Sequence, residues 1–170
     1  CSEWVDKQLI ENNQHTVDKA MADYVQIYVD YVRQLSGHHL YEVQVDFSDW
    51  VPDGFGTSDA LIVADNVLHV IDLKYGKGVK VDAANNTQGM LYALGAIADY
   101  GDLFAFDKIQ ITIVQPRLDH IDEWEITLPE LLKWGEWVRQ RAELALSVML
   151  NAHQVKSSVS GAKQRQSARN

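Results

Sequence analysis

Two aspartates and a lysine in the middle of the 170-residue sequence, Asp59, Asp72 and Lys74, are of the types that suit metal-ion chemistry. Carboxylate oxygens are the ligands that Mg²⁺ prefers in proteins. An ion held by paired carboxylates polarises a phosphodiester and lowers the pKa of a bound water, and a nearby lysine can orient that water and stabilise the developing charge. These residues predict phosphodiester hydrolysis, provided that the fold brings them together.

A predicted β-hairpin brings the two aspartates together. Two strand-like apolar runs, residues 59–64 and 67–74, are separated by Asp65 and Asn66, which both tolerate the left-handed backbone of a tight turn. In a two-residue hairpin centred on this pair, Asp59 lies directly opposite Asp72. Opposed side chains have Cβ atoms about 4.5–5.5 Å apart, where like charges destabilise the pair.

The surroundings of the two acids make a chelated cation the simplest compensation for their repulsion. Both runs are otherwise rich in Leu, Ile and Val, so the carboxylates are expected near the core, where desolvation adds a further cost. A hard divalent cation bound by both acids offsets these costs. Lys74 lies two residues beyond Asp72, and the two-residue period of a strand places it on the same face.

Three further residues are candidates for the same site. Glu42 lies on the polar face of the preceding strand and could complete the ligand set or support a second ion. Gln88 and Tyr92 are one helical turn apart, so both can point from one helix face towards the site or the DNA backbone. Each residue also has an ordinary interpretation, because an Asp-x-Lys tripeptide is usually a solvated strand end and the others are usually surface residues. The combination favours a site.

The remaining elements predict a single α/β domain with a central mixed sheet flanked by helices. Two-residue alternation predicts strands, and spacing of three and four residues predicts helices. The order is α, β, β, β, α, β, a short β, and a long C-terminal α. The predicted elements are a helix at 16–35 capped by Thr16, a strand at 41–47, the hairpin, a helix at 85–100, strands at 109–114 and 123–127, and a helix at about 128–150.

Composition excludes several classes of protein. The formal net charge of −9 argues against a protein that coats nucleic acid through a broad basic surface, although it does not exclude a nuclease. A single cysteine, Cys1, excludes an internal disulfide framework and a cysteine-rich cluster within this chain. The sequence has no bilayer-length apolar run and no signal-peptide pattern, which predicts a soluble, cytoplasmic protein.

The two ends of the sequence carry their own expectations. The chain begins at Cys1 in a polar, helix-like stretch, so we expect an upstream segment to be missing. Residues 155–170 contain four basic residues and no acid, which predicts a basic, flexible tail after a single domain at 1–154.

Three motifs in order resemble the PD-(D/E)XK nuclease superfamily, in its RecB-like and lambda-exonuclease-like branch. GTSD at residues 56–59 is similar to the branch's G-x-x-D, IDLK at 71–74 to its D-x-K, and QGMLY at 88–92 to its Q-x-x-x-Y. The likeness extends over about residues 16–150, where the sequence also resembles a phage and prophage family of RecB-like proteins.

The resemblance implies a restriction-endonuclease-like core, αβββαβ, and a Mg²⁺- or Mn²⁺-dependent DNA nuclease. Asp59, Asp72 and Glu42 would be metal ligands, Lys74 the catalytic lysine, and Gln88 and Tyr92 the extra motif. It favours an exonuclease in phage recombination or DNA processing, acting in a bacterial host or phage-infected cell. The expected partners are DNA, a phage single-strand annealing protein and further copies of the chain.

Two departures from the branch affect these expectations. The usual histidine of the first helix is absent from residues 16–35, and His15 lies just before them. The cysteines that hold an iron-sulfur cluster in some members are also absent from the last residues, SGAKQRQSARN, so no cluster is expected.

Secondary candidates and alternative functions remain open. Four residues could contact DNA phosphates from loops near the site: Lys77, Lys80, Gln115 and Arg117. The chain could also be a catalytically inactive nucleic-acid-binding subunit of the same fold, or a structure-specific or restriction-type endonuclease. Intact Asp59, Asp72 and Lys74 argue against the inactive subunit.

Overall fold

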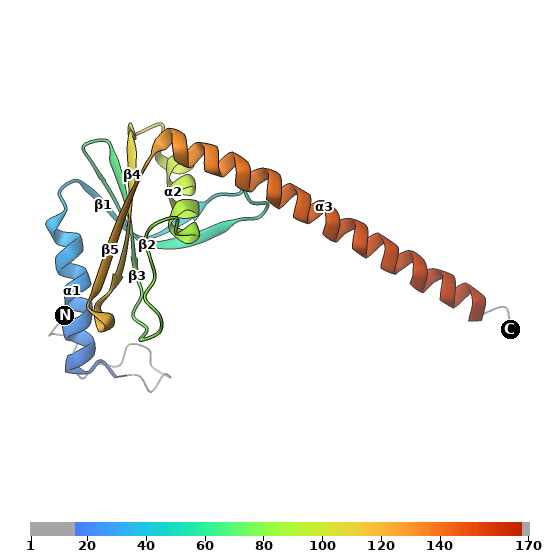
Figure 1. Ribbon diagram of the computed structural model, residues 1–170, viewed down its shortest axis with the longest axis horizontal. Helices are drawn as coiled ribbons and strands as arrows, with labels where there is room; N and C mark the ends of the chain where they lie inside the picture. Colours follow the sequence, from blue (N-terminus) through green and yellow to red (C-terminus); the bar gives the residue numbers. More distant parts are fainter. Residues whose placement is uncertain (1–15, 168–170) are drawn as a thin grey trace.

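A five-stranded mixed sheet forms the centre of the computed structural model, which describes the backbone of residues 16–167 and the side chains of residues 16–151 (Figure 1). The strand order is β1-β2-β3-β4-β5. Only β3 and β4 run parallel, and α2 connects them, because parallel neighbours require a crossover. The strands are β1 (His38–Asp46), β2 (Phe55–Ala64), β3 (Val67–Leu73), β4 (Lys108–Gln115) and β5 (His120–Thr127).

Helices cover both faces of this sheet. The helices are α1 (Lys19–Gln34), α2 (Thr87–Tyr100) and α3 (Leu128–Ser167), with a 3₁₀ turn, η2 (Pro116–Leu118). Val32 of α1 packs with Ala60, Ile62 and Ile71 on one face. On the other face, α2 and the start of α3 close a larger apolar core that includes Leu61, Val70, Leu94, Ile111 and Leu131. The predicted α/β class and element order are confirmed.

The β2–β3 hairpin forms in the predicted register. Asp65 and Asn66 have φ angles of 48° and 63°, the left-handed conformation that a two-residue hairpin turn requires. Ala64 pairs with Val67, and the ladder continues to Ala60 opposite Ile71. The turn chemistry and the apolar alternation therefore specify the same register.

Several boundaries differ from those predicted, and β2, for example, begins at Phe55 rather than at Asp59. Asp18, not Thr16, caps α1, and its Oδ1 accepts a hydrogen bond from the Met21 amide at 2.6 Å. β5 begins at His120 rather than Glu123, because an edge strand with alternating polar residues carries only a weak apolar signal. α3 continues to Ser167, beyond the predicted end near residue 150.

The predicted boundary between a domain and a tail at residue 154 falls inside α3. No proline follows Pro129 in the sequence, so no proline interrupts α3 after its first turn. The Lys, Gln, Ala and Arg residues near its end favour helix. A basic composition alone did not mark an end of secondary structure. None of the described helices combines the length and apolar character needed to cross a membrane.

Candidate functional site

The candidate site lies where β2 and β3 separate. The ladder between them ends at Ala60 and Ile71, one step before Asp59 and Asp72. Beyond this point β2 stays paired with β1, and β3 stays paired with β4. Figure 1 shows β1 and β2 curving away from the other three strands below α2. We call the gap between the diverging strands, with Asp59, Asp72 and Lys74, the fork.

Asp59 lies in the gap rather than in a regular cross-strand pair. Its Oδ2 accepts a hydrogen bond of 2.7 Å from the Leu73 amide on the other strand. Burial raises the pKa of Asp59, and the charges of Asp72 and Glu42 raise it further, against the opposing effects of Leu73 and Lys74. The two aspartates are brought together as predicted, with the difference that the ladder stops before them.

Asp72 is buried, and Lys74 neutralises it. Nζ of Lys74 donates to Oδ1 of Asp72 at 3.1 Å and lies 2.9 Å from Oδ2. The contact to Oδ2 lacks hydrogen-bond geometry, and this buried oxygen receives no hydrogen bond from the described residues. Asp72 is 8% exposed, so this buried carboxylate oxygen has only the Lys74 ammonium beside it among the described residues.

A chain of polar contacts extends from Asp72 to α2. Nζ of Lys74 also donates to Oε1 of Gln88 at 2.7 Å, and Nε2 of Gln88 donates to the Tyr92 hydroxyl at 3.1 Å. The Tyr92 ring lies against Gly56, where an added Cβ would be 2.5 Å from a ring carbon. The glycine of the GTSD motif is therefore required by the close approach of Tyr92, and Gln88 and Tyr92 are connected to the fork.

Glu42 has a different position. It is exposed, and its φ of 50° interrupts β1 at the level of Asp59, between the pairs Tyr41–Ala60 and Val43–Ser58. A left-handed non-glycine residue in a strand is strained, and such irregularities often lie next to functional sites. Over residues 16–151, no group of three or more His, Cys, Asp or Glu side chains could hold a metal ion. Glu42 as a third ligand beside Asp59 and Asp72 stays a prediction.

Tyr28 of α1 was missed by the sequence reasoning. It is half-buried, and burial together with the charges of Asp59, Glu42 and Asp72 holds the pKa of Tyr28 well above its ordinary value. Because this hydroxyl stays protonated, it can donate a hydrogen bond on this side of the fork. Its sequence signal was its place in the apolar stripe of the first helix, which indicated only a core residue.

The secondary candidates separate into two groups. Gln115 is 3% exposed, and its side chain accepts from the Val81 amide at 2.7 Å and donates to the Val79 carbonyl at 3.2 Å. Both polar atoms of Gln115 hold the loop in this structure, and its contact with phosphate stays a prediction. Lys77 and Lys80 are exposed in that loop. The guanidinium of Arg117 lies 4.9 Å from the ring centroid of Tyr75, beside the same loop.

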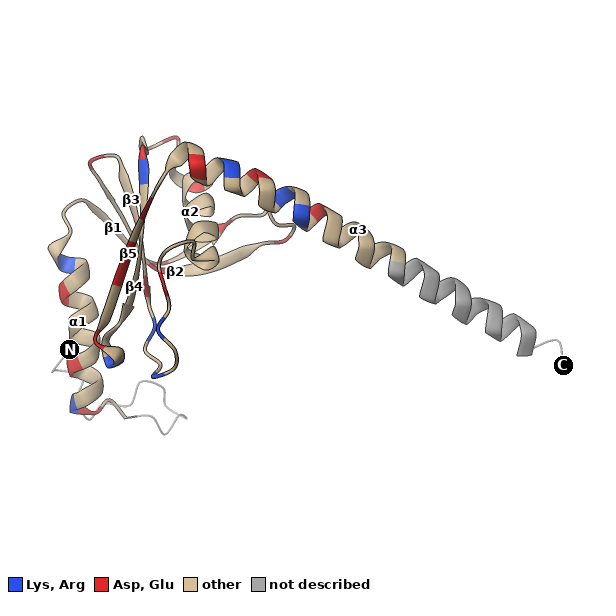
Figure 2. Cartoon of the chain, in the orientation of Figure 1, with Lys and Arg blue, Asp and Glu red and all other residues tan. Residues whose placement is uncertain are grey.

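The distribution of charge fits the acidic composition. Figure 2 shows Lys and Arg on α1, in the loop after β3, on β4 and on α3, with Asp and Glu on the same two helices and on the strands. Any nucleic acid that binds here would be held by a few local cations and by a bound metal ion, which reverses the sign of the local field.

Two features of the fork fit a divalent cation. The buried Oδ2 of Asp72 has no hydrogen-bond donor among the described residues, and the adjacent Asp59 repels it, so a cation would satisfy both groups. Both acids also supply the oxygen ligands that Mg²⁺ and Mn²⁺ use. Mg²⁺ commonly keeps several waters and is bound through one or two carboxylates, which Asp59 and Asp72 could supply.

A family model described as "Protein of unknown function (DUF2800)" matches residues 2–166. The chain belongs to this family. A solved structure described as "Crystal structure of SSO0001" is 18% identical, with a TM-score of 0.37 over 76% of this chain and 61% of the other. That likeness is too low to support an inference. Neither comparison tests the resemblance to PD-(D/E)XK nucleases, so function has to be argued from the fork.

Proposed function

We propose that this member of the DUF2800 family is a metal-dependent DNA nuclease of the PD-(D/E)XK superfamily, with a RecB-like core and its active centre at the fork. The observation that carries the proposal is the buried Asp72, with one unsatisfied oxygen, held between Asp59 and Lys74. Buried like charges with an incomplete set of partners are costly, and they persist where function requires them.

Each residue of the fork has a role in this proposal. Asp59 and Asp72 would hold Mg²⁺ or Mn²⁺, which when bound polarises the scissile phosphate and activates a water. Lys74 positions that water and stabilises charge on the phosphate oxygens. Gln88 holds Lys74 at 2.7 Å, and Tyr92 holds Gln88, so both are positioning residues for the lysine. Tyr28 supplies a protonated hydroxyl on the α1 side.

Exonuclease action in phage recombination or DNA processing is the form that the Q-x-x-x-Y resemblance favours. The Gln88–Tyr92 contact chain supports a functional use of that motif. A binding subunit without turnover is the second candidate, and the absence of a histidine from residues 16–35 favours it. An endonuclease of the same fold would use the same fork and is separated from the exonuclease only by its substrate.

The test is digestion of linear and covalently closed circular duplex DNA with Mg²⁺, Mn²⁺ or EDTA. Wild-type protein is compared with Asp72→Asn and with Asp99→Asn, which changes an exposed aspartate of α2 as a matched control. We expect metal-dependent loss of linear DNA by wild type and Asp99→Asn only. Equal cutting of circles would identify an endonuclease, whereas inactivity of folded wild type with every metal would favour the binding subunit.

A further inference from the structure

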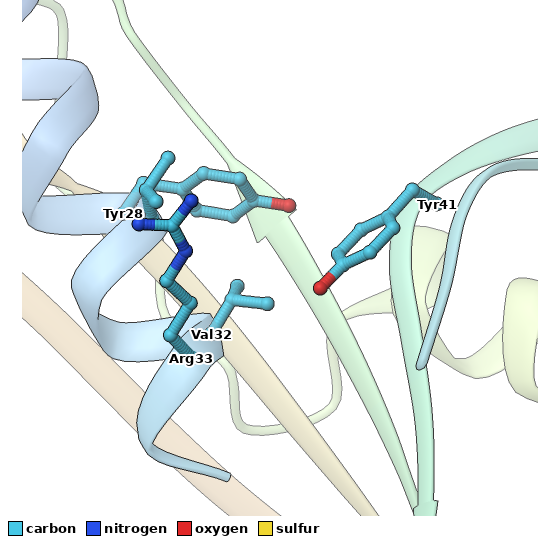
Figure 3. Close-up of a pocket in the computed structure, with 5 residues that line it drawn as sticks. Tyr28, Val32, Arg33 and Tyr41 are labelled. Atoms are coloured by element: carbon cyan, nitrogen blue, oxygen red, sulfur yellow. The ribbon is translucent and has the colours of Figure 1, made fainter. Parts of the chain in front are cut away.

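A pocket of about 270 Å³ lies between α1 and β1 on the Tyr28 side of the fork. It is lined by Tyr28, Val29, Val32 and Arg33 from α1 and by Tyr41 from β1. Figure 3 shows the hydroxyl ends of the two tyrosines pointing into the same space, with Val32 and Arg33 along the helix side. The pocket therefore has aromatic walls, an aliphatic surface and one cation.

This pocket adjoins the carboxylates of the fork. Tyr41 precedes Glu42 and pairs with Ala60, which follows Asp59 on the neighbouring strand. On the other wall, Tyr28 is close enough to Asp59, Glu42 and Asp72 for their charges to act on its hydroxyl. Because successive residues of a strand alternate between the two faces, Tyr41 and Ala60 lie on the α1 face of the sheet, and the pocket borders the fork from that side.

The lining indicates what kind of group fits. The Tyr41 side chain is 55% exposed, so its ring is accessible to a ligand that enters the pocket. Three nearby acids disfavour an anionic group inside the pocket, so its occupant should be neutral and flat. Arg33 is exposed and has no ion-pair partner within residues 16–151, so its charge is available at the pocket edge for an adjoining phosphate.

A nucleobase has these properties, and aromatic side chains are the usual platforms on which unpaired bases stack. A base inside a duplex is already paired and stacked on both faces, so it would first have to leave the helix. We propose that this pocket is a subsite for one nucleobase of a single DNA strand, adjacent to the scissile phosphate. The inference rests on the proposed nuclease function, whose substrate it narrows to a single-stranded or unpaired end.

The experiment measures binding of single-stranded oligonucleotides that carry 2-aminopurine, with EDTA present so that no cleavage occurs. Stacking on a tyrosine ring quenches this fluorescent base, and anisotropy of an end label reports affinity. The variants are Tyr41→Phe, which keeps the ring but removes the hydroxyl contact to Nδ1 of His39 at 2.9 Å, and Tyr41→Leu, which removes the ring. Trp137→Leu, at a 50% exposed aromatic position on α3, is the control.

We expect the wild type, Tyr41→Phe and Trp137→Leu all to quench the 2-aminopurine fluorescence and to bind the strand with the same affinity. Tyr41→Leu should relieve the quenching and weaken binding about 5- to 150-fold, the range measured for loss of one stacked base. Blunt duplex with the same base in its interior should show no Tyr41-dependent quenching. An equal loss of affinity in Tyr41→Phe and Tyr41→Leu would overturn the subsite, and so would no loss of affinity in either variant. Displacement of the strand by free deoxyadenosine monophosphate at a similar concentration would also overturn it.

Failure of the subsite and failure of the nuclease proposal give different results. Metal-dependent cleavage by a wild type that shows no Tyr41-dependent quenching keeps the nuclease and removes the subsite. Tyr41-dependent quenching by a wild type that never cleaves DNA keeps the subsite and supports the binding subunit.

Discussion

Two polar clusters lie at the same end of the sheet, and they differ in whether their polar atoms have hydrogen-bond partners. In the fork, at the end of β3, the Asp72 carboxylate has an oxygen without a hydrogen bond and a like charge beside it. At the end of β4, Gln115, His120 and Asp122 form what we call the loop anchor. These three side chains contact the backbone of residues 79–83 at 2.7–3.2 Å.

The comparison distinguishes structure from function among buried polar groups. Every contact of the loop anchor satisfies a backbone group that would otherwise lack a partner, which stabilises the fold. The fork instead places two carboxylates close together, and although Lys74 pairs with Asp72 and the Leu73 amide with Asp59, one Asp72 oxygen has no hydrogen bond from the described residues. Substitutions in the two clusters should therefore affect different measurements.

The largest expected effect is on catalysis, in Lys74→Met. Loss of one charge-stabilising donor at a reaction centre lowers the rate by about 10²- to 10³-fold. Lys108→Met is the matched control, because Lys108 also pairs with an acid, Glu125, at 2.7 Å, but both partners are about half exposed. It should change neither the initial rate on linear DNA nor stability by more than about 1 kcal/mol. Equal rates for the two variants would remove Lys74 from the mechanism.

Loss of the loop anchor should mainly affect stability. Gln115→Ala leaves the Val81 amide without its acceptor and opens a gap at a 3% exposed position. The free energy of unfolding should fall by about 1–3 kcal/mol in urea titrations, and activity should fall far less than in Lys74→Met. An inactive Gln115→Ala protein with unchanged stability would show that the loop anchor belongs to the site.

The sequence predicted the two clusters unequally. Asp65-Asn66 and the apolar alternation determined the β2–β3 register, so the proximity of Asp59 and Asp72 could be derived from local patterns. The divergence of the strands just before these residues depends on pairing with β1 and β4, which no local pattern reports. For the same reason, the left-handed backbone of Glu42 could not be foreseen.

Gln115 and Tyr28 show how a residue type can mislead. Gln115 follows a buried strand and looked like a surface contact, because its loop partners lie more than thirty positions away in sequence. Tyr28 looked like a core residue, because helical spacing gives the face of a side chain but not where its hydroxyl ends. Both roles depend on tertiary contacts, and the site was therefore predicted less completely than the fold.

A smaller effect concerns stability against pH in Asp59→Asn, measured without metal. The pKa of Asp59 is raised in the fold, chiefly by burial, so the folded state holds this proton more tightly than the unfolded state. Its contribution is therefore favourable at low pH and is lost as pH rises from the unfolded value, about 3.9, through the raised folded value. At neutral pH, Asp59→Asn should be modestly more stable than wild type, and the difference should shrink on acidification.

Adding Mg²⁺ extends the same prediction. A cation that binds only the folded state stabilises it by mass action, so thermal unfolding of wild type should shift upward with Mg²⁺ concentration. Asp59→Asn should lose most of that shift. A variant that is less stable than wild type at neutral pH would contradict the prediction. It would show that the hydrogen bond from the Leu73 amide to Asp59 stabilises the fold more than the repulsion at the fork destabilises it.

The smallest expected effect is on salt dependence, through the loop that the anchor holds. Lys77 and Lys80 are exposed there, and each phosphate contact contributes a slope of nearly one to the fall of log affinity with log salt. Lys77→Gln and Lys80→Gln should each reduce that slope by about one in EDTA, whereas Lys133→Gln on α3 should not. If both loop variants keep the wild-type slope while Gln115→Ala still loses stability, the loop anchor supports the fold alone, and DNA is held without this loop.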